Sequence, residues 1–200
     1  MPVGVPKIVF GMPEDEDPNC NRLYHLRYLF LGQELNSEIG NQIAGLLIYF
    51  TLEDPTQEFT FFINSPGGSV LYGLTIYDLM ENLPPDVTTI GMGMVSSMAS
   101  FLLTGGTMNK RTALPNARVM LHQPVASFYE SLAGDFWMEE ESVRDLRDRV
   151  IEIYTQRLGQ PSEIVEWHME KEIFMTATEA KAFGIVDQIG EKGTGLIKKN

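Results

Sequence analysis

Residues 87–108, VTTIGMGMVSSMASFLLTGGTM, contain no charged side chain and lie between Asp86 and Lys110. About 20 apolar residues suffice for a transmembrane helix, so length alone would let this stretch cross a bilayer. Its composition argues against that, because seven positions are Ser or Thr and four are Gly. The stretch therefore predicts a buried strand over residues 87–91, a tight glycine-containing turn, and a buried helix over about residues 97–103.

The predicted corner between this strand and this helix is a candidate site for nucleophilic chemistry. Ser97 falls near the start of the helix, where backbone N–H groups are free and the helix dipole favours negative charge. A nucleophile and the donors that bind an oxyanion could share this corner. Serines at helix starts commonly act as caps, however, and Ser96 and Ser100 lie close by, so spacing alone does not choose among the three.

Around this corner, strands and helices alternate at short intervals. A strand is expected at residues 28–31, and a core-facing helix capped by Asn36 or Ser37 follows it. Further strands and helices are expected, in order, at residues 59–64, 70–83, 87–91, 97–103 and 118–121, with a final strand at 185–189. Such alternation is typical of βα units, so we expect an α/β domain with a mainly parallel sheet.

The chain between residue 125 and Gly184 is predicted to be mostly helical. Residues 125–134 are irregular, and residues 135–158 form an amphipathic helix of roughly 24 residues, about 36 Å long. Such a helix either projects from the body to meet another subunit or lies on the sheet, and the sequence leaves both open. Thr176 and Glu179 have the spacing of a capping box and begin a helix that ends at Gly184.

Composition limits the classes of function. The chain has 200 residues, of which 44% are hydrophobic, so we expect one compact domain over residues 19–200 behind an extended arm over residues 1–18. With 27 acidic against 15 basic residues the net charge is −12, which argues against nucleic-acid binding. The single cysteine, Cys20, excludes an internal disulfide and a cysteine zinc cluster. An acidic run, EDED, stands where a signal peptide would be apolar, so no signal peptide is expected.

Few side chains are candidates for chemistry. The turn Ser65-Pro66-Gly67-Gly68 could aim backbone N–H groups at an anion or a polarised carbonyl, or it could be an ordinary turn. Of the three histidines (His25, His122 and His168) only His122 stands at a predicted strand end, where α/β proteins gather catalytic groups. The 27 acids give no unique third member of a Ser-His-acid set. No metal-binding or nucleotide-binding motif is present.

Four strings occur in an order and spacing that resemble the proteolytic subunits of the Clp protease: INSPGGSV, GMGMVSSMASFLL, LPNARVMLHQP and MTATEAKAFGIVDQI. The resemblance covers about residues 22–189, and the start MPVGVPK and the string FMTATEAKAFGIVD are most similar to the plastid-encoded form. It implies a crotonase-like α/β fold, in which a head of βα units carries a projecting helical handle at about residues 125–160.

The resemblance also implies roles for particular residues. Ser97 matches the family's nucleophile and His122 its base, while the backbone N–H groups of Gly68 and Met98 match its oxyanion hole. The string KEIF stands where the family has R-D-x-F, so Glu172 takes the position of the third, acidic member, where aspartate is usual. Neither a metal nor a cofactor is implied in this subunit, because the ATP is used by a partner chaperone.

The implied setting is a pair of stacked seven-membered rings, built from this chain alone or together with related subunits, which an AAA+ Clp chaperone supplies with unfolded proteins. The implied location is the chloroplast stroma or, alternatively, a bacterial cytoplasm, with no membrane or nucleic-acid partner. Three functions stay open from sequence. The chain is an active serine endopeptidase subunit, a catalytically weak or inactive structural subunit of the same rings, or a crotonase-type acyl-CoA enzyme.

Overall fold

The computed structural model describes residues 22–123 and 133–191, so the expected arm and residues 125–132 of the expected handle lie outside the described residues. The helices are α1 (Arg22–His25), α2 (Ser37–Glu53), α3 (Val70–Asn82), α4 (Met98–Thr104), α5 (Ala133–Leu158), α6 (Ser162–Lys171) and α7 (Ala177–Phe183). The strands are β1 (Tyr28–Leu31), β2 (Phe59–Ser65), β3 (Val87–Ser96), β4 (Arg111–Ala113), β5 (Arg118–Met120), β6 (Phe174–Thr176) and β7 (Gln188–Ile189).

The expected, mainly parallel sheet is confirmed. Strands β1, β2, β3, β4 and β7 are neighbours in that order, and each neighbouring pair among them is parallel. Strand β5 pairs with β3 in parallel, and β6 adds to β5 in the antiparallel direction. Two of these strands were not predicted: β6, and β4, which occupies a stretch where a turn was expected.

The sequence prediction was wrong about where strand β3 ends. It does not end at Gly91 in a tight turn but continues to Ser96 and leads directly into α4. Its first half pairs with β4 through residues 89–91, and its second half pairs with β5 through residues 94–96. Gly93, at φ 60°, allows the bend between the halves, and Asn64 Oδ1 accepts a hydrogen bond from Met94 N (3.0 Å) there. The glycines therefore shape the inside of a strand, because each half must meet a different neighbour.

Helix α2 forms as its sequence predicts. Asn36 is the cap, and its side-chain oxygen accepts hydrogen bonds from the N–H groups of Glu38 and Ile39 (3.0 and 3.1 Å). Apolar side chains at helical spacing are buried against the sheet and α3: Ile39, Ile43, Leu47 and Phe50. Helix α7 likewise has the predicted capping box between Thr176 and Glu179 and ends at Gly184.

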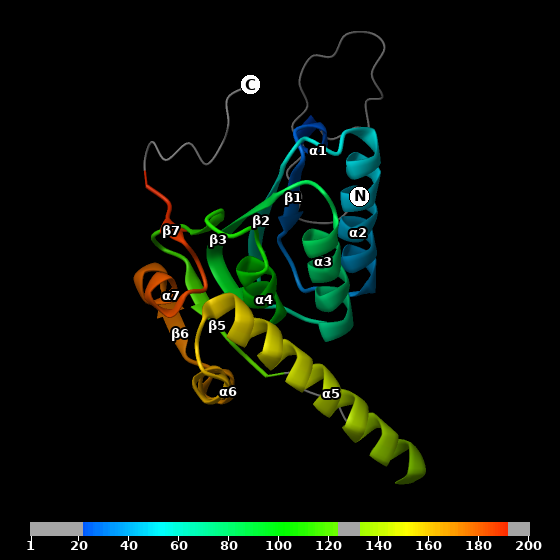
Figure 1. Cartoon of the computed structure of the whole chain (residues 1–200), viewed down its shortest axis with the longest axis vertical. Helices are drawn as coiled ribbons and strands as arrows, with labels where there is room; N and C mark the ends of the chain where they lie inside the picture. Colours follow the sequence, from blue (N-terminus) through cyan, green and yellow to red (C-terminus); the bar gives the residue numbers. More distant parts are fainter. Residues whose placement is uncertain (1–21, 124–132, 192–200) are drawn as a thin grey trace.

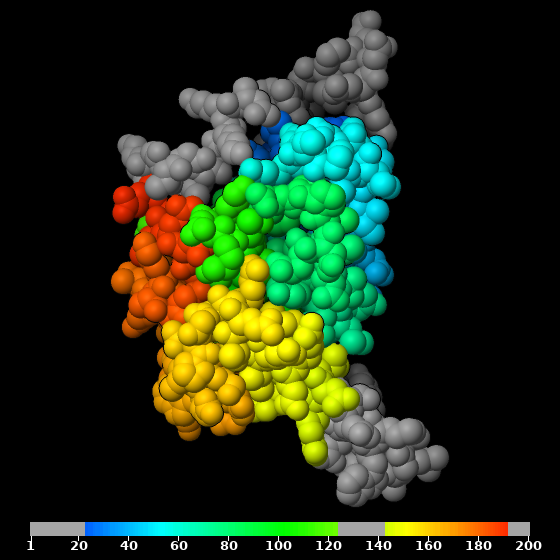
Figure 2. Space-filling view, viewed as in Figure 1, coloured from blue at the N-terminus to red at the C-terminus, as the bar shows by residue number. Residues whose placement is uncertain are grey.

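Helix α5 is 26 residues long, about 39 Å at 1.5 Å per residue. Its last turns are anchored, because Val150, Ile153, Tyr154 and Leu158 are buried. Its first turns run away from the sheet (Figure 1), while its last turns, in yellow, lie beside α6, in orange (Figure 2). The helix therefore projects, as one of the two predictions had it. Among the described helices none is both long and apolar enough to cross a membrane.

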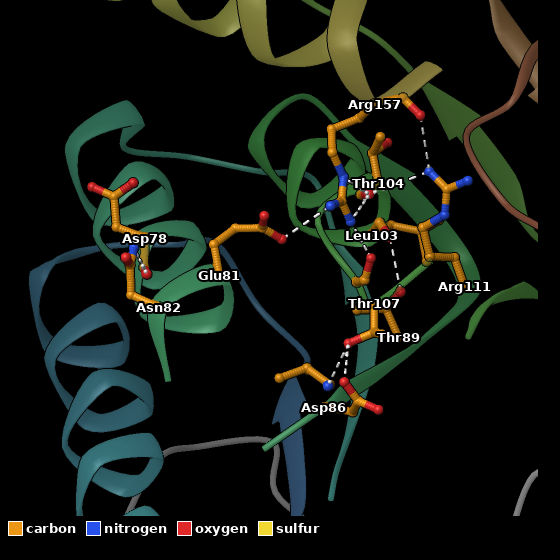
Figure 3. A network of polar contacts seen from close by, with 12 residues as sticks. Asp78, Glu81, Asn82, Asp86, Thr89, Leu103, Thr104, Thr107, Arg111 and Arg157 are labelled. Carbon is orange, nitrogen blue, oxygen red and sulfur yellow. Dashed lines mark hydrogen bonds and ion pairs between the residues drawn. The ribbon is translucent and has the colours of Figure 1, made fainter. Parts of the chain in front are cut away.

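Two arginines hold the end of α4 in place. Arg157, in the last turn of α5, donates from its guanidinium to the carbonyl oxygens of Thr104 and Gly106 and to the carboxylate of Glu81 (3.0 Å for the last). Arg111, in β4, donates from Nη1 to the same carbonyl oxygen of Thr104 at 3.4 Å (Figure 3). Cations at a helix C-terminus compensate its exposed carbonyls and dipole. The short helix that begins beside Ser97 is thus tied firmly to β4 and α5.

Candidate active site

Four strand ends meet at one edge of the sheet. The carboxyl ends of β2, β3 and β5 lie together because these strands are parallel, with Ser65 opposite Val95 and Ser96 opposite Met120. Strand β6 is antiparallel, so its beginning lies at the same edge, where Phe174 faces Met120. Each candidate feature lies close to one of these ends: the Gly67-Gly68 turn, Ser97, His122 and Glu172. The residues that the sequence singled out are therefore brought to one place.

Ser97 has a strained backbone, with φ 55° and ψ −127°. A non-glycine residue in this region costs on the order of 1–3 kcal/mol, and such residues cluster at functional sites. Ser97 is the N-cap residue of α4, but its side chain makes no capping hydrogen bond. The corner resembles the strained strand-to-helix turn that exposes a nucleophilic serine in hydrolases. A capping role is therefore wrong for Ser97, whose Oγ makes no hydrogen bond within the described part of the chain.

The two glycines of the Ser65–Gly68 turn are required by geometry. Gly67 has φ 98°, and an added Cβ would lie 2.7 Å from Ser97 Cβ and 2.9 Å from Met98 N. Gly68 has φ 142°, and an added Cβ would collide with Leu35 O. Side chains at these positions would push the turn off both the serine corner and the neighbouring backbone. The glycines thus permit a close approach.

Two backbone N–H groups beside Ser97, those of Gly68 and Met98, have no partner in the part of the chain that the structure describes. Leu35 N donates to Gly67 O and Ser69 N donates to Leu35 O (2.7 and 2.8 Å), and in this parallel bridge the N–H of Gly68 faces away from Leu35. Met98 is the first residue of α4, where an N–H has no partner within the helix. Within residues 22–123 and 133–191, neither N–H has an acceptor. Two free donors next to one serine side chain can bind an oxyanion.

His122 and Glu172 face each other across the β5–β6 pair. Continuing the antiparallel register two residues past Met120 and Phe174 places 122 opposite 172. The distance from His122 Nε2 to Glu172 Oε1 is 2.8 Å, with 23% of the histidine side chain and 57% of the glutamate side chain exposed. Glu172 has a left-handed backbone, φ 52°, at the end of α6. Among the described residues no hydrogen bond joins His122 to Ser97.

The other two histidines are in different surroundings. His25 is the last residue of α1, and its ring lies edge-on to Phe50, at 6.4 Å between centroids. His168 Nδ1 is 2.9 Å from Ile164 O, and its ring packs on Phe183. The described part of the chain holds no group of His, Cys, Asp and Glu side chains arranged to bind a metal.

A family model described as Clp protease matches residues 14–193 of this chain. The chain belongs to the Clp protease family. The resemblance stated from the sequence is thereby confirmed, and so is its α/β fold class. Related chains are also similar over nearly their full length. ATP-dependent Clp protease proteolytic subunits from Acorus gramineus and Chloranthus spicatus are each 52% identical to it, over 98% of both chains. The one from Vitis vinifera is 52% identical over 94% of this chain and 98% of its own.

Sequence reasoning missed two features of this Clp-family site. Strand β6 places Glu172, and its only sequence signal was a run of three residues, FMT, just before the capping box. The second feature is a buried hydrogen bond between Ser100 and Tyr154. The sequence predicted only an amphipathic helix over residues 135–158, because periodicity reports which face is buried and not what a hydroxyl on that face contacts.

Proposed function

We propose that this chain is a serine endopeptidase subunit of an ATP-dependent Clp protease and cleaves unfolded proteins to short peptides. The observation that carries the proposal is the corner at Ser97. There a strained serine lies beside the N–H groups of Gly68 and Met98, and neither its hydroxyl nor these two N–H groups have a hydrogen-bond partner among the described residues. The names of the plant relatives support the same activity. An acyl-CoA enzyme would need neither the serine hydroxyl nor a histidine–carboxylate pair at this edge.

The proposed reaction is acyl transfer through Ser97. His122 accepts the proton of Ser97 Oγ as this oxygen attacks the carbonyl carbon of the scissile peptide bond. The negative charge on the carbonyl oxygen is stabilised by the N–H groups of Gly68 and Met98. His122 then gives the proton to the leaving amine, and an ester on Ser97 remains. Water, deprotonated by His122, cleaves the ester and restores the serine. This chemistry uses no cofactor in this subunit.

Glu172 is proposed as the acid that orients His122. In the Ser-His-acid template Nε2 faces the serine and the acid holds the other ring nitrogen. Here Glu172 Oε1 contacts Nε2 itself, so the imidazole must turn from Glu172 toward Ser97 before it can act as base. This observation favours a second candidate function, a catalytically weak or inactive structural subunit of the same assembly.

Covalent labelling with a fluorophosphonate tests the proposal. The assembled full-length protein is treated with the probe, and the modified residue is located by mass spectrometry. We expect the label on Ser97, its loss in Ser97→Ala, and a large loss of rate in His122→Ala. An assembly in which related subunits are labelled while Ser97 is not would overturn the peptidase proposal and support the structural subunit.

Substitution of Glu172 also distinguishes an active peptidase subunit from an inactive structural subunit. Glu172→Gln removes the charge that stabilises an imidazolium, and loss of the orienting acid costs on the order of 10⁴ in turnover in the serine-protease template. Glu172→Asp keeps the charge on a side chain shorter by one methylene, which withdraws it from Nε2. We expect Glu172→Gln to label and cleave more slowly by at least about a hundredfold, and Glu172→Asp to match or exceed the natural chain. Unchanged rates in Glu172→Gln would exclude Glu172 from the mechanism.

The proposed partners follow from the same family. We propose that the chain assembles into stacked heptameric rings, alone or with related subunits, and that an AAA+ chaperone uses the ATP and delivers the unfolded substrate. Because the relatives come from plants, the chloroplast stroma is the proposed location.

A further inference from the structure

A buried chain of hydroxyl groups leads from α5 to the backbone of Ser97. The hydroxyl of Tyr154 lies 2.9 Å from Ser100 Oγ, and Ser100 Oγ donates to the carbonyl oxygen of Ser97 at 2.7 Å. Tyr154 is 1% exposed and Ser100 is fully buried. Solvent therefore cannot replace either partner, and the contact joins residues that are 54 positions apart in the sequence.

The direction of these hydrogen bonds follows from counting protons. The Ser97 carbonyl can only accept, so the single proton of Ser100 Oγ is used on it. The contact between Tyr154 and Ser100 then requires the tyrosine to donate. Burial raises the pKa of the Tyr154 phenol well above its usual range, which keeps that donor protonated. Each hydroxyl polarises the next, and such chains are stronger than their separate members.

The acceptor at the end of this chain is the strained residue itself. The backbone of Ser97 is held on one side by its N–H, which donates to Met120 O (2.9 Å). On the other side its carbonyl accepts from Phe101 N (3.1 Å) and from Ser100 Oγ. A strained conformation persists only where its surroundings determine it more than once. Among the described residues, the hydrogen bond from Ser100 Oγ is the side-chain contribution to this restraint, and the other two bonds come from the backbone.

We propose that Tyr154 and Ser100 are positioning residues that hold the Ser97 corner in its reactive conformation. This inference rests on the proposed function, since it assigns a role to a nucleophile at Ser97. Neither side chain touches substrate. They act on the Ser97 carbonyl, and so set the direction of Ser97 Oγ relative to the N–H groups of Gly68 and Met98.

The geometry makes α5 the support of the whole of α4. Tyr154 reaches the beginning of α4 through Ser100 and packs edge-on against Phe101, at 5.4 Å between ring centroids. One turn further along α5, Arg157 binds the carbonyl oxygens at the end of α4 (Figure 3). The serine corner is thus held from a projecting helix and not only from the sheet.

Tyr154→Phe tests the proposal, because it removes one hydroxyl and keeps the ring. We expect the rate constant for fluorophosphonate modification of Ser97, and kcat for a peptide, to fall roughly tenfold, the effect of one hydrogen bond of ordinary strength. The binding constant of the probe and KM should stay unchanged. The matched control is Tyr77→Phe. Tyr77 also packs on Phe101 (5.1 Å), but its hydroxyl has no hydrogen-bond partner among the described residues.

Ser100→Ala interrupts the same path at its middle, and the double variant completes a thermodynamic cycle. Once Ser100 is alanine, Tyr154 has no route to Ser97, so the double variant should label no more slowly than Ser100→Ala alone. If Tyr154→Phe does not fold, a natural labelling rate in Ser100→Ala overturns the proposal by itself.

Three other results would also overturn the positioning role: natural labelling by Tyr154→Phe, an equal loss in Tyr77→Phe, or rate losses that multiply in the double variant. If the natural chain is not labelled at Ser97 at all, the proposed function fails instead. The two failures are therefore distinguishable.

Discussion

Left-handed backbone conformations mark the site at the scale of single residues. Four described non-glycine residues have positive φ (Arg27, Ser97, Asn109 and Glu172), and two of them are the proposed nucleophile and the proposed acid. Hydrogen bonds to both the N–H and the carbonyl oxygen of Ser97 hold it in this conformation, and Glu172 is held by its place at the end of α6. Strain is kept at these residues because the surrounding contacts determine where their side chains point.

Gly67→Ala should disrupt this arrangement. Its backbone has φ 98°, and the new Cβ would meet Ser96 O and Ser97 Cβ at 2.7 Å. We expect a loss of about 1–3 kcal/mol in the free energy of unfolding, because the strain cannot relax without moving the serine corner. Labelling of Ser97 should fall as well. Urea unfolding and labelling, measured on the same preparation, check both.

The matched control is Gly45→Ala, in the exposed face of α2. Nothing lies within 4 Å of the Cβ that this change would add. Alanine in a helix interior is favoured over glycine by about 0.5–1 kcal/mol, so this variant should be stabilised and label normally. A destabilised Gly45→Ala, or a Gly67→Ala protein with natural stability and labelling, would contradict the steric account.

At the scale of elements, the site depends on a strand that serves two neighbours. Strand β3 pairs with β4 before its bend and with β5 after it. Strand β4 is in turn joined to the segment just before β7. The guanidinium and backbone N–H of Arg111, in β4, bind the carboxylate of Asp187 (Nη2–Oδ1 2.6 Å). Only 3% of the arginine side chain and 17% of the aspartate side chain are exposed, so water screens this pair little.

Asp187→Asn should lower stability at neutral pH more than at acid pH. Burial alone would raise the pKa of Asp187, but the hydrogen bonds from Arg111 outweigh it and lower that pKa. A lowered folded-state pKa means that the ionised aspartate stabilises the fold above its unfolded pKa, about 3.9. The stabilisation is lost as the pH falls through the folded value. We expect Asp187→Asn to cost about 1.5–3 kcal/mol at pH 7, the worth of hydrogen bonds to a charged group.

Urea unfolding at several pH values measures the difference between the Asp187 variant and the natural chain, which should shrink toward pH 3. Glu152→Gln is the control, because its pair with Arg149 is exposed on both sides (53% and 56%) and such pairs contribute little. A constant difference across the pH range would show that Asp187 acts through packing and not through its charge.

At the scale of the whole molecule, the described chain leaves surfaces that suit assembly. Helix α5 extends beyond the body (Figure 1), and α2 exposes Ile48, Tyr49 and Leu52, which share one helix face. Leu52 is 81% exposed. Exposed apolar side chains grouped on one helix face are suited to a contact with another protein, which fits the proposed ring.

We therefore expect the protein to run as a large oligomer at micromolar concentration, alone or with related subunits. Leu52→Lys should shift the distribution toward smaller species, because it places a charge in an apolar contact. Multi-angle light scattering measures the mass. Glu53→Gln, which neutralises the next residue, is the control. A stable, catalytically active monomer of the natural chain would contradict ring assembly.

Much of this architecture could be predicted from the sequence, because it depends on neighbours in the chain. Helical spacing of apolar residues predicts α2 and α5, the Thr176–Glu179 box begins α7, and alternating strands and helices indicate a parallel sheet. The strings around Ser97 and His122 indicate the family. The uncharged stretch that begins at Val87 placed a serine at a strand-to-helix corner, although it misplaced the end of the strand.

Tertiary structure decided what the chain brings together from a distance. Composition and spacing could not choose Glu172 from 27 acids, and only the family resemblance pointed to it. It faces His122 because β6 pairs antiparallel with β5. The glycines at 91 and 93 lie inside β3 because β4 and β5 pair with successive halves of this strand. Tyr154 meets Ser100 because α5 packs on α4. Local periodicity reports which side of an element is buried. The partner on that side depends on how the elements pack, which no short stretch of sequence contains.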